Sequence, residues 1–445
     1  MWWLSFAGRT ALVYGLRLGT AAASFASAAA LARLLASEHY GKFVFLSTLA
    51  SLLTQILAFG AVPFMTRGIA QARGAHDTAT LADHIRNAGT VVFFAALLTM
   101  GGMGLGGLFW GSYRGDSLTA WLAAGLAGTL GLSLSYHSAL LAGFERVLPA
   151  QLAHAAAPGL TALLAGSVWL SAPPPALIGP ELGFIVQIIA LMITLGVLLP
   201  LSRRTRVANC GTRDFQGWTS MKGLARYMRD GVILGLNQLL VNGFTQIDIL
   251  MLGVLGSAED VAVYHVGNRV AYMALVVLGA VHFVTAPSVA RYWGGEQREA
   301  FDNLLARASL TAFTGCLCLA VVIGAWAAEL ERLFGSSFDG AKDIMAVLLA
   351  GHVAFAFFGL SDTALVMSKF AGLSVAAFLA ANVTNVIGNL LMIPRWGASG
   401  AAASSAIALV TLGIWLWAAC AHKLDSRFDV VSALLILTRK RQRCA

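Results

Sequence analysis

The chain has 445 residues, of which 58% are hydrophobic and only 11% are charged, and its mean hydropathy is +0.75. A soluble domain carries about 25% charged residues, so this composition excludes an ordinary soluble protein and indicates a membrane protein. The formal net charge of +9 does not indicate nucleic-acid binding, because the basic residues fall in the connections between apolar segments.

Twelve apolar segments follow one another along the chain. A membrane-spanning helix needs about 20 apolar residues, and each segment has that length. The short alternating segments that are typical of a β-barrel do not occur in the sequence. We therefore predict an all-α polytopic membrane protein with about 12 transmembrane helices. The predicted spans are 10–33, 42–66, 87–111, 117–142, 149–171, 177–201, 229–255, 261–289, 303–327, 341–365, 370–393 and 398–421.

Lysine and arginine residues are distributed unequally between the connections. Most of the 30 lie on the cytoplasmic side if the N-terminus is cytoplasmic, and the connection from Ser202 to Arg229 is the longest and the most basic. Positively charged residues are enriched in cytoplasmic loops of membrane proteins. Both termini of this multi-pass protein are therefore predicted to be cytoplasmic.

The two halves of the chain resemble each other. LLASEHYGKF after the first span resembles LGSAEDVAVYHVG after the seventh, and VPFMTRGIAQA resembles TAPSVARYW. Six spans per repeat give a parallel repeat and two lobes around a central cavity. Chance similarity among helices rich in Ala, Leu and Gly is the alternative. The predicted parts are an N-terminal six-helix lobe at 1–201, a basic cytoplasmic linker at 202–228, a C-terminal six-helix lobe at 229–421 and a basic cytoplasmic tail at 422–445.

The tail combines an apolar run, VVSALLIL, with a basic cluster, RKRQR. The apolar run is too short to span a membrane. It lies either along the inner leaflet, where the basic cluster would attract anionic membrane lipids, or in solvent.

Three stretches resemble the oligosaccharide flippases of bacterial polysaccharide and lipopolysaccharide biosynthesis. They are ALARLLASEHYGKFVFLSTLASLLTQILAFG, DILMLGVLGSAEDVAVYHVGNRVAYM and LLMIPRWGASGAAASSAIA. The superfamily of these flippases also holds multidrug-and-toxin exporters and the lipid II flippase. The resemblance covers essentially the whole chain. It implies a flippase of the bacterial inner membrane that moves undecaprenyl-diphosphate-linked oligosaccharide to the periplasmic leaflet by alternating access. A polysaccharide polymerase and chain-length machinery are possible protein partners of such a flippase.

Polar residues within the apolar segments are candidates for substrate binding, because ionisable groups inside a span usually face a bundle interior or a watery cavity. Arginine donates pairs of hydrogen bonds to phosphate, so Arg17 and Arg269 would match a diphosphate. The resemblance supports Arg269, because an arginine of the lipid II flippase stands at the corresponding place. The alternatives are that the Arg17 side chain extends to the cytoplasmic membrane–water interface and that Arg269 forms an ion pair with Asp248. Further candidates are Asn237, Gln238, Asn242 and Gln55, with helix packing as the alternative for Gln55.

Asp248, in TQIDILMLG, resembles an aspartate in the sodium site of the lipid II flippase. The partners implied by the resemblance lie in the eleventh and twelfth spans and are Asn385, Asn389 and Ser405. Asn385 and Asn389 are four residues apart and share a helix face. Asn389 stands where the family's sodium site has an aspartate, so one carboxylate remains and coupling to Na⁺, to H⁺ or to neither stays open. Hydrogen bonding between helices is the alternative role of the asparagines.

Other functions are less well supported by the sequence. We find no metal-ligand spacing and no phosphate-binding loop, and predict a transporter without a cofactor rather than an enzyme. A membrane-embedded glycan polymerase or ligase would need a large outer loop with clustered acids, arginines or histidines. A cation-coupled multidrug exporter would keep the fold, but its cavity would need acidic and aromatic groups more than arginines.

Overall fold

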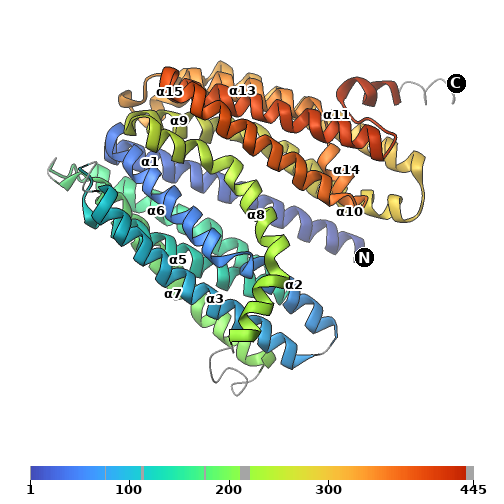
Figure 1. The fold of residues 1–445 in the computed structure, drawn as a ribbon, viewed down its shortest axis with the longest axis horizontal. Coiled ribbons are helices and arrows are strands. Elements are labelled where there is room, and N and C mark those ends of the chain that lie inside the picture. The colour runs from blue at the N-terminus through green and yellow to red at the C-terminus, as the bar shows by residue number, and fades with distance from the viewer. Residues whose placement is uncertain (1, 76, 112–114, 175–176, 211–220, 437–445) are drawn as a thin grey trace. The chain divides into compact units, whose positions relative to one another are not determined.

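All regular structure in the described part of the chain is helical (Figure 1). The computed structural model describes residues 2–75, 77–111, 115–174, 177–210 and 221–436, and only the backbone at 2–14, 17, 221 and 233. The predicted all-α fold class is confirmed. The helices are α1 (Trp2–Ala58), α2 (Ala61–Gly74), α3 (Thr78–Gly106), α5 (Leu118–Gly143), α6 (Val147–Leu170), α7 (Pro180–Cys210), α8 (Met221–Leu255), α9 (Ala258–Ala271), α10 (Leu275–Gly294), α11 (Arg298–Ala325), α12 (Ala327–Phe334), α13 (Ala341–Phe357), α14 (Ser361–Met367) and α15 (Ala371–Lys423), with short turns of other helix types at Gly107–Gly111, Tyr272–Ala274 and Ser336–Phe338.

The long apolar helices account for the predicted membrane spans. Among the described residues, nine helices are long and apolar enough to cross a membrane, and the pair α13 and α14, bent by 49°, makes a tenth. Two of the nine are kinked, α1 at Ala36 and α15 at Gly397, and each covers two of the predicted spans. The structure is therefore compatible with twelve membrane crossings.

Three predicted spans are interrupted, and one of them, predicted at 341–365, is the bent pair α13 and α14. The span predicted at 42–66 breaks between α1 and α2, where Phe59 and Gly60 both have positive φ. The span predicted at 261–289 is divided by a 3₁₀ turn at Tyr272–Ala274 between α9 and α10. Hydropathy reports length and apolar content but carries no information on local backbone breaks, so the sequence pattern missed all three breaks.

The chain forms two compact helical units, Met1–Leu239 and Leu240–Ala445. The division falls inside α8, later in the chain than the linker predicted at 202–228. Helices α7 and α8 extend into both ends of that segment, and residues 211–220 lie outside the described part. Two units are present as predicted, while the predicted cavity between them stays a prediction.

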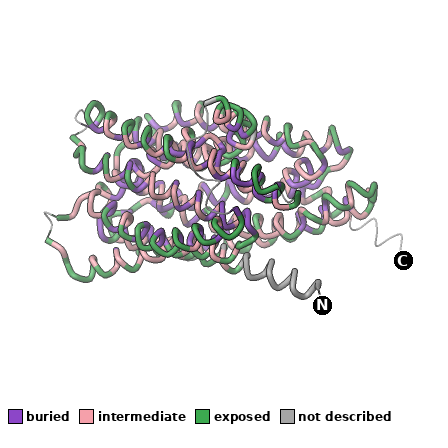
Figure 2. Tube along the Cα trace, turned by 90° about the horizontal axis from the view of Figure 1, so that it is seen from below, coloured by how far each residue is buried: buried purple, intermediate pink, exposed green. Residues whose placement is uncertain are grey.

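Within each unit, neighbouring helices bury their contacting sides and leave their outer sides apolar and exposed (Figure 2). In the first unit α1 packs along α6, and α5 packs against α3 and α7, while in the second α15 packs along α13. The outer sides carry large apolar side chains such as Leu163, Val197 and Val284, which are 71%, 74% and 63% exposed. Apolar surface of this extent is typical of contact with lipid.

Two glycines let α8 approach the break between α1 and α2. A Cβ atom added at Gly235 would lie 2.8 Å from the carbonyl carbon of Phe59, and one added at Gly60 would lie 2.5 Å from the Cα of Gly235. Gly60 also has a φ of +74°, which residues with a side chain rarely adopt. The close approach of these backbones therefore depends on glycine at both positions.

We expect Gly235→Ala to lower the melting temperature of the detergent-solubilised protein. The added methyl group forces the two backbones apart, which costs about 1–3 kcal/mol. Gly231→Ala is the matched control, since it lies one turn earlier on α8 and its added Cβ would meet only the Phe64 side chain, at 3.5 Å. Equal melting temperatures for the two variants would show that the close approach does not stabilise the fold.

Candidate functional site

A sharp break in α15 creates the candidate site. Gly397 has a φ of 51° and a ψ of −130°, a conformation that is accessible mainly to glycine. Asp260 holds the break, because its Oδ1 accepts a hydrogen bond from the backbone N–H of Ala398 at 3.0 Å. The other oxygen of Asp260 accepts from the backbone N–H and the hydroxyl of Ser257, in the capping box that begins α9. The start of α9 is thereby connected to the point where α15 turns.

The two arms of α15 on either side of the break lie against each other. The hydroxyl of Ser404 donates to the backbone carbonyl of Asn385 at 2.9 Å, and the side-chain amide of Asn385 donates to Ser405 Oγ at 3.2 Å. Residues of the two arms that are distant from the break along the chain therefore share one buried polar region. A residue with a side chain at 397 would strain the turn that brings them together.

The carboxylate of Asp248, on α8, lies at the centre of this region and is 2% exposed. Its Oδ2 accepts hydrogen bonds from the Tyr264 hydroxyl at 2.6 Å and from the Ser405 hydroxyl at 2.5 Å, and its Oδ1 accepts one from the Asn389 amide at 2.7 Å. Burying a carboxylate is costly unless donors surround it. These short bonds satisfy it and connect α8, α9 and both arms of α15. We call these four residues, together with Asn385, the Asp248 network.

The Asp248 network also holds an unsatisfied acceptor. Asn389 Nδ2 donates to Asn385 Oδ1 at 3.0 Å, but Asn389 Oδ1 is buried and has no hydrogen-bond partner. Nearly all buried side-chain oxygens in folded proteins have a partner. Carboxylate, amide and hydroxyl oxygens are the ligands that hard cations prefer. The carboxylate, amide and hydroxyl oxygens at and beside Asp248 therefore fit the ligand preference of a small cation.

The structure brings together all four residues that the sequence analysis assigned to cation coupling, namely Asp248, Asn385, Asn389 and Ser405. Their role stays a prediction. It also adds Tyr264, which the sequence analysis missed. A tyrosine in an apolar helix needs a hydrogen-bond partner for its hydroxyl, and that requirement is the signal that could have identified it.

The alternative in which Arg269 pairs with Asp248 is wrong. Within the described part of the chain, the groups that hydrogen-bond to Asp248 are hydroxyls and an amide, and none of the ion pairs includes Asp248. Arg269 is half-buried on α9. Its predicted role in substrate binding is thus separate from the network.

The residues predicted for substrate binding are divided between the two units. Gln55, Asn237 and Gln238 lie in the first unit with Arg17, whose side chain lies outside the described residues, and Asn242 and Arg269 lie in the second. Asn237 and Gln238 are exposed on α8. Gln55 donates to the backbone carbonyl and the hydroxyl of Ser51 in its own helix, at 3.2 and 3.1 Å. That bonding agrees with the packing alternative for Gln55.

Comparison with known families shows the family to which the chain belongs. The family model described as polysaccharide biosynthesis protein matches residues 10–293. The chain belongs to the polysaccharide biosynthesis protein family. The MatE model matches residues 234–391, which include Asp248, Tyr264 and both asparagines of the network. The predicted resemblance to the oligosaccharide flippases of the superfamily that includes multidrug exporters is confirmed, and the chain is a transporter of that superfamily.

Solved structures with a similar fold include MATE transporters. An inward-facing multidrug resistance MATE family transporter of the MOP superfamily has a TM-score of 0.74 at 16% identity, with 88% of this chain and 92% of that chain covered. MATE in the straight conformation has a TM-score of 0.62 at 16% identity, with 97% and 94% covered. A variant of the Vibrio cholerae MATE transporter VcmN has a TM-score of 0.60 at 16% identity, with 94% and 98% covered. No curated protein matches the chain.

We expect Asp260→Ala to destabilise the protein, because the N–H of Ala398 and the start of α9 both lose a charged acceptor. The free energy of unfolding should fall by about 1–3 kcal/mol, which is measured as a lower melting temperature in detergent. Glu259→Ala removes the neighbouring, exposed carboxylate and should leave the melting temperature unchanged. If Asp260→Ala behaves as Glu259→Ala does, Asp260 does not hold the break in α15.

Proposed function

We propose that the protein is a flippase that moves undecaprenyl-diphosphate-linked oligosaccharide from the cytoplasmic to the periplasmic leaflet of the bacterial inner membrane. The observation that supports this most is the family match over residues 10–293. Arg17 and Arg269 lie in apolar helices and would offer the diphosphate matching positive charge. The product would be available to a polysaccharide polymerase and its chain-length machinery for surface polysaccharide or lipopolysaccharide synthesis. Both termini would lie in the cytoplasm.

Alternating access is the mechanism that this proposal requires. A diphosphate with its sugars cannot cross the hydrocarbon region without a polar path, because an unpaired charge in that region is costly. The support is that the chain forms two compact helical units of similar sequence pattern. Rocking of two repeats around a fixed binding site is how many transporters expose the site to each side in turn.

The Asp248 network would bind a monovalent cation, Na⁺ or H⁺, and couple its movement to transport. A proton would bind to the carboxylate itself. A sodium ion would take oxygens from Asp248, Asn389 and Ser405, including the Asn389 oxygen that has no hydrogen-bond partner. In both cases the charge of Asp248 is neutralised, and the hydrogen bonds that connect α8, α9 and α15 change. Cation binding would thereby alter how these three helices are held together.

A second candidate function is the export of drugs by cation coupling. The match of the MatE model to residues 234–391 favours it, and the network lies largely in that region. The two arginines in apolar helices favour the anionic lipid instead, because a cationic drug would be repelled by them.

The test is made in cells in which the gene has been deleted. We expect lipid-linked oligosaccharide to accumulate and surface polysaccharide to be lost, and the wild-type gene to reverse both. Arg269→Ala should restore surface polymer at roughly a tenth or less of the wild-type rate, because a charged hydrogen bond contributes about 1.5–3 kcal/mol. Asp248→Asn should also fail to restore surface polysaccharide, because it removes the only carboxylate of the network.

Arg307→Ala is the matched control, because Arg307 is exposed on α11 in the same unit. It should complement as the wild type does, and immunoblots should show equal amounts of each variant. Complementation by Asp248→Asn would argue against a cation site. A deletion strain that accumulates no lipid-linked oligosaccharide and becomes sensitive to drugs would contradict the flippase and support the exporter.

A further inference from the structure

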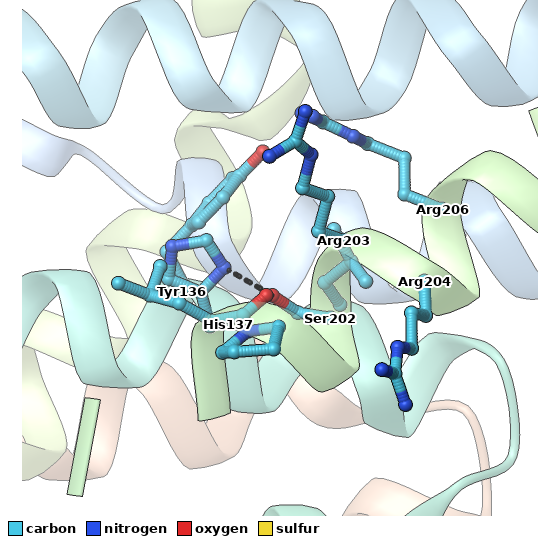
Figure 3. A pocket seen from close by; sticks show the side chains of 9 residues that line it. Tyr136, His137, Ser202, Arg203, Arg204 and Arg206 are labelled. Carbon is cyan, nitrogen blue, oxygen red and sulfur yellow. Dashed lines mark hydrogen bonds between the residues drawn. The ribbon is translucent and has the colours of Figure 1, made fainter. Parts of the chain in front are cut away.

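A cavity of about 550 Å³ lies in the first unit, between the ends of α5 and α7 (Figure 3). Cavities of about 300–1,000 Å³ are typical of small-molecule sites. One wall is basic, with Arg203, Arg204 and Arg206 from α7, and another is apolar, with Leu140, Leu199 and Pro200. None of these residues belongs to the substrate or cation sites proposed above.

The arginines are arranged so that two of them converge. Figure 3 shows the guanidinium groups of Arg203 and Arg206 pointing toward one another and toward the hydroxyl end of Tyr136, while Arg204 points the other way. Like charges three residues apart on a helix repel each other. Among the described residues, no carboxylate forms an ion pair with Arg203 or Arg204. Convergence of cationic groups at the mouth of a cavity favours an anionic ligand.

The polar wall of the cavity is held in place by bonds within the protein. The Ser202 hydroxyl lies 3.0 Å from His137 Nδ1 and 2.9 Å from the carbonyl of Leu199, to which it donates. The Tyr136 hydroxyl donates to the carbonyl of Ile85 at 3.1 Å. Ser202 is 3% exposed, so this wall is built into the helix packing rather than into a surface loop. A prearranged wall reduces the entropy cost of binding a ligand.

The apolar wall indicates that the anion belongs to a lipid. Leu199 lines the cavity and is 43% exposed, so the apolar wall of the cavity reaches the outer surface of α7. Free phosphate gains nothing from apolar contacts, whereas the glycerol and acyl chains of a phospholipid do. Basic pockets between transmembrane helices bind anionic lipid head groups. We infer that this cavity binds the phosphate head group of an anionic phospholipid from the surrounding bilayer.

Native mass spectrometry of the full-length protein tests this inference. The detergent-solubilised protein is mixed with equal amounts of phosphatidylglycerol and phosphatidylcholine that have the same acyl chains. We expect the wild type to retain phosphatidylglycerol in at least about tenfold preference, as two charged hydrogen bonds would give. Arg203→Gln combined with Arg206→Gln should remove the preference. Arg67→Gln, which changes an exposed arginine on α2 in the same unit, should leave it intact.

Three results would overturn the inference. The first is equal retention of the two lipids by the wild type, which does not depend on whether any variant folds. The second is an unchanged preference in the double variant. The third is that inorganic phosphate raises the melting temperature of the wild type as much as phosphatidylglycerol does, which would assign the cavity to a soluble anion. The readout is lipid binding, so none of these results bears on whether the protein moves lipid-linked oligosaccharide.

Discussion

The buried carboxylate of Asp248 is the constraint on which the second unit depends. A carboxylate that is 2% exposed needs a full set of donors, and here they come from α9 and from both arms of α15. The donors can reach it only because α15 turns back at Gly397, and Asp260 holds that turn. One electrostatic requirement thus determines how α8, α9 and α15 pack. In the proposed function the same network would offer oxygens to a cation, so the interaction that stabilises the packing is also one that a cation would change.

The sequence predicts much of the fold because a membrane imposes a minimum length on apolar helices. Each predicted span lies in one helix of the structure or in two consecutive helices with a short break between them. Backbone breaks are not predicted by hydropathy, because they depend on the residue at single positions. Gly60 and Gly235 permit a close approach between segments far apart in the sequence. The hydropathy near residue 59 does not predict this approach. The division between the two units falls inside α8, where apolar composition continues unchanged.

The candidate site could be predicted in part. The spacing of Asn385 and Asn389 places them on one helix face, and the family resemblance supplied Asp248 and Ser405 as their partners. Tyr264 was missed because a tyrosine in an apolar helix is usually interpreted as packing. The basic cavity was missed for a different reason. Arg203, Arg204 and Arg206 belong to a basic connection, where the positive-inside rule already explains them. Only the packing of α7 against α5 shows that they line a cavity with His137 and Leu140.

The most direct test of the proposed coupling is leaflet exchange in reconstituted vesicles. The purified protein is placed in vesicles that contain polyprenyl-diphosphate-linked oligosaccharide, and a glycosidase added outside reports the lipid that has reached the outer leaflet. We expect an imposed gradient of Na⁺ or of H⁺ to accelerate exchange by the wild type, and Asp248→Asn to lose that acceleration. Exchange no faster than in protein-free vesicles under either gradient would contradict the flippase, and an equal response of Asp248→Asn would contradict the role of the Asp248 network.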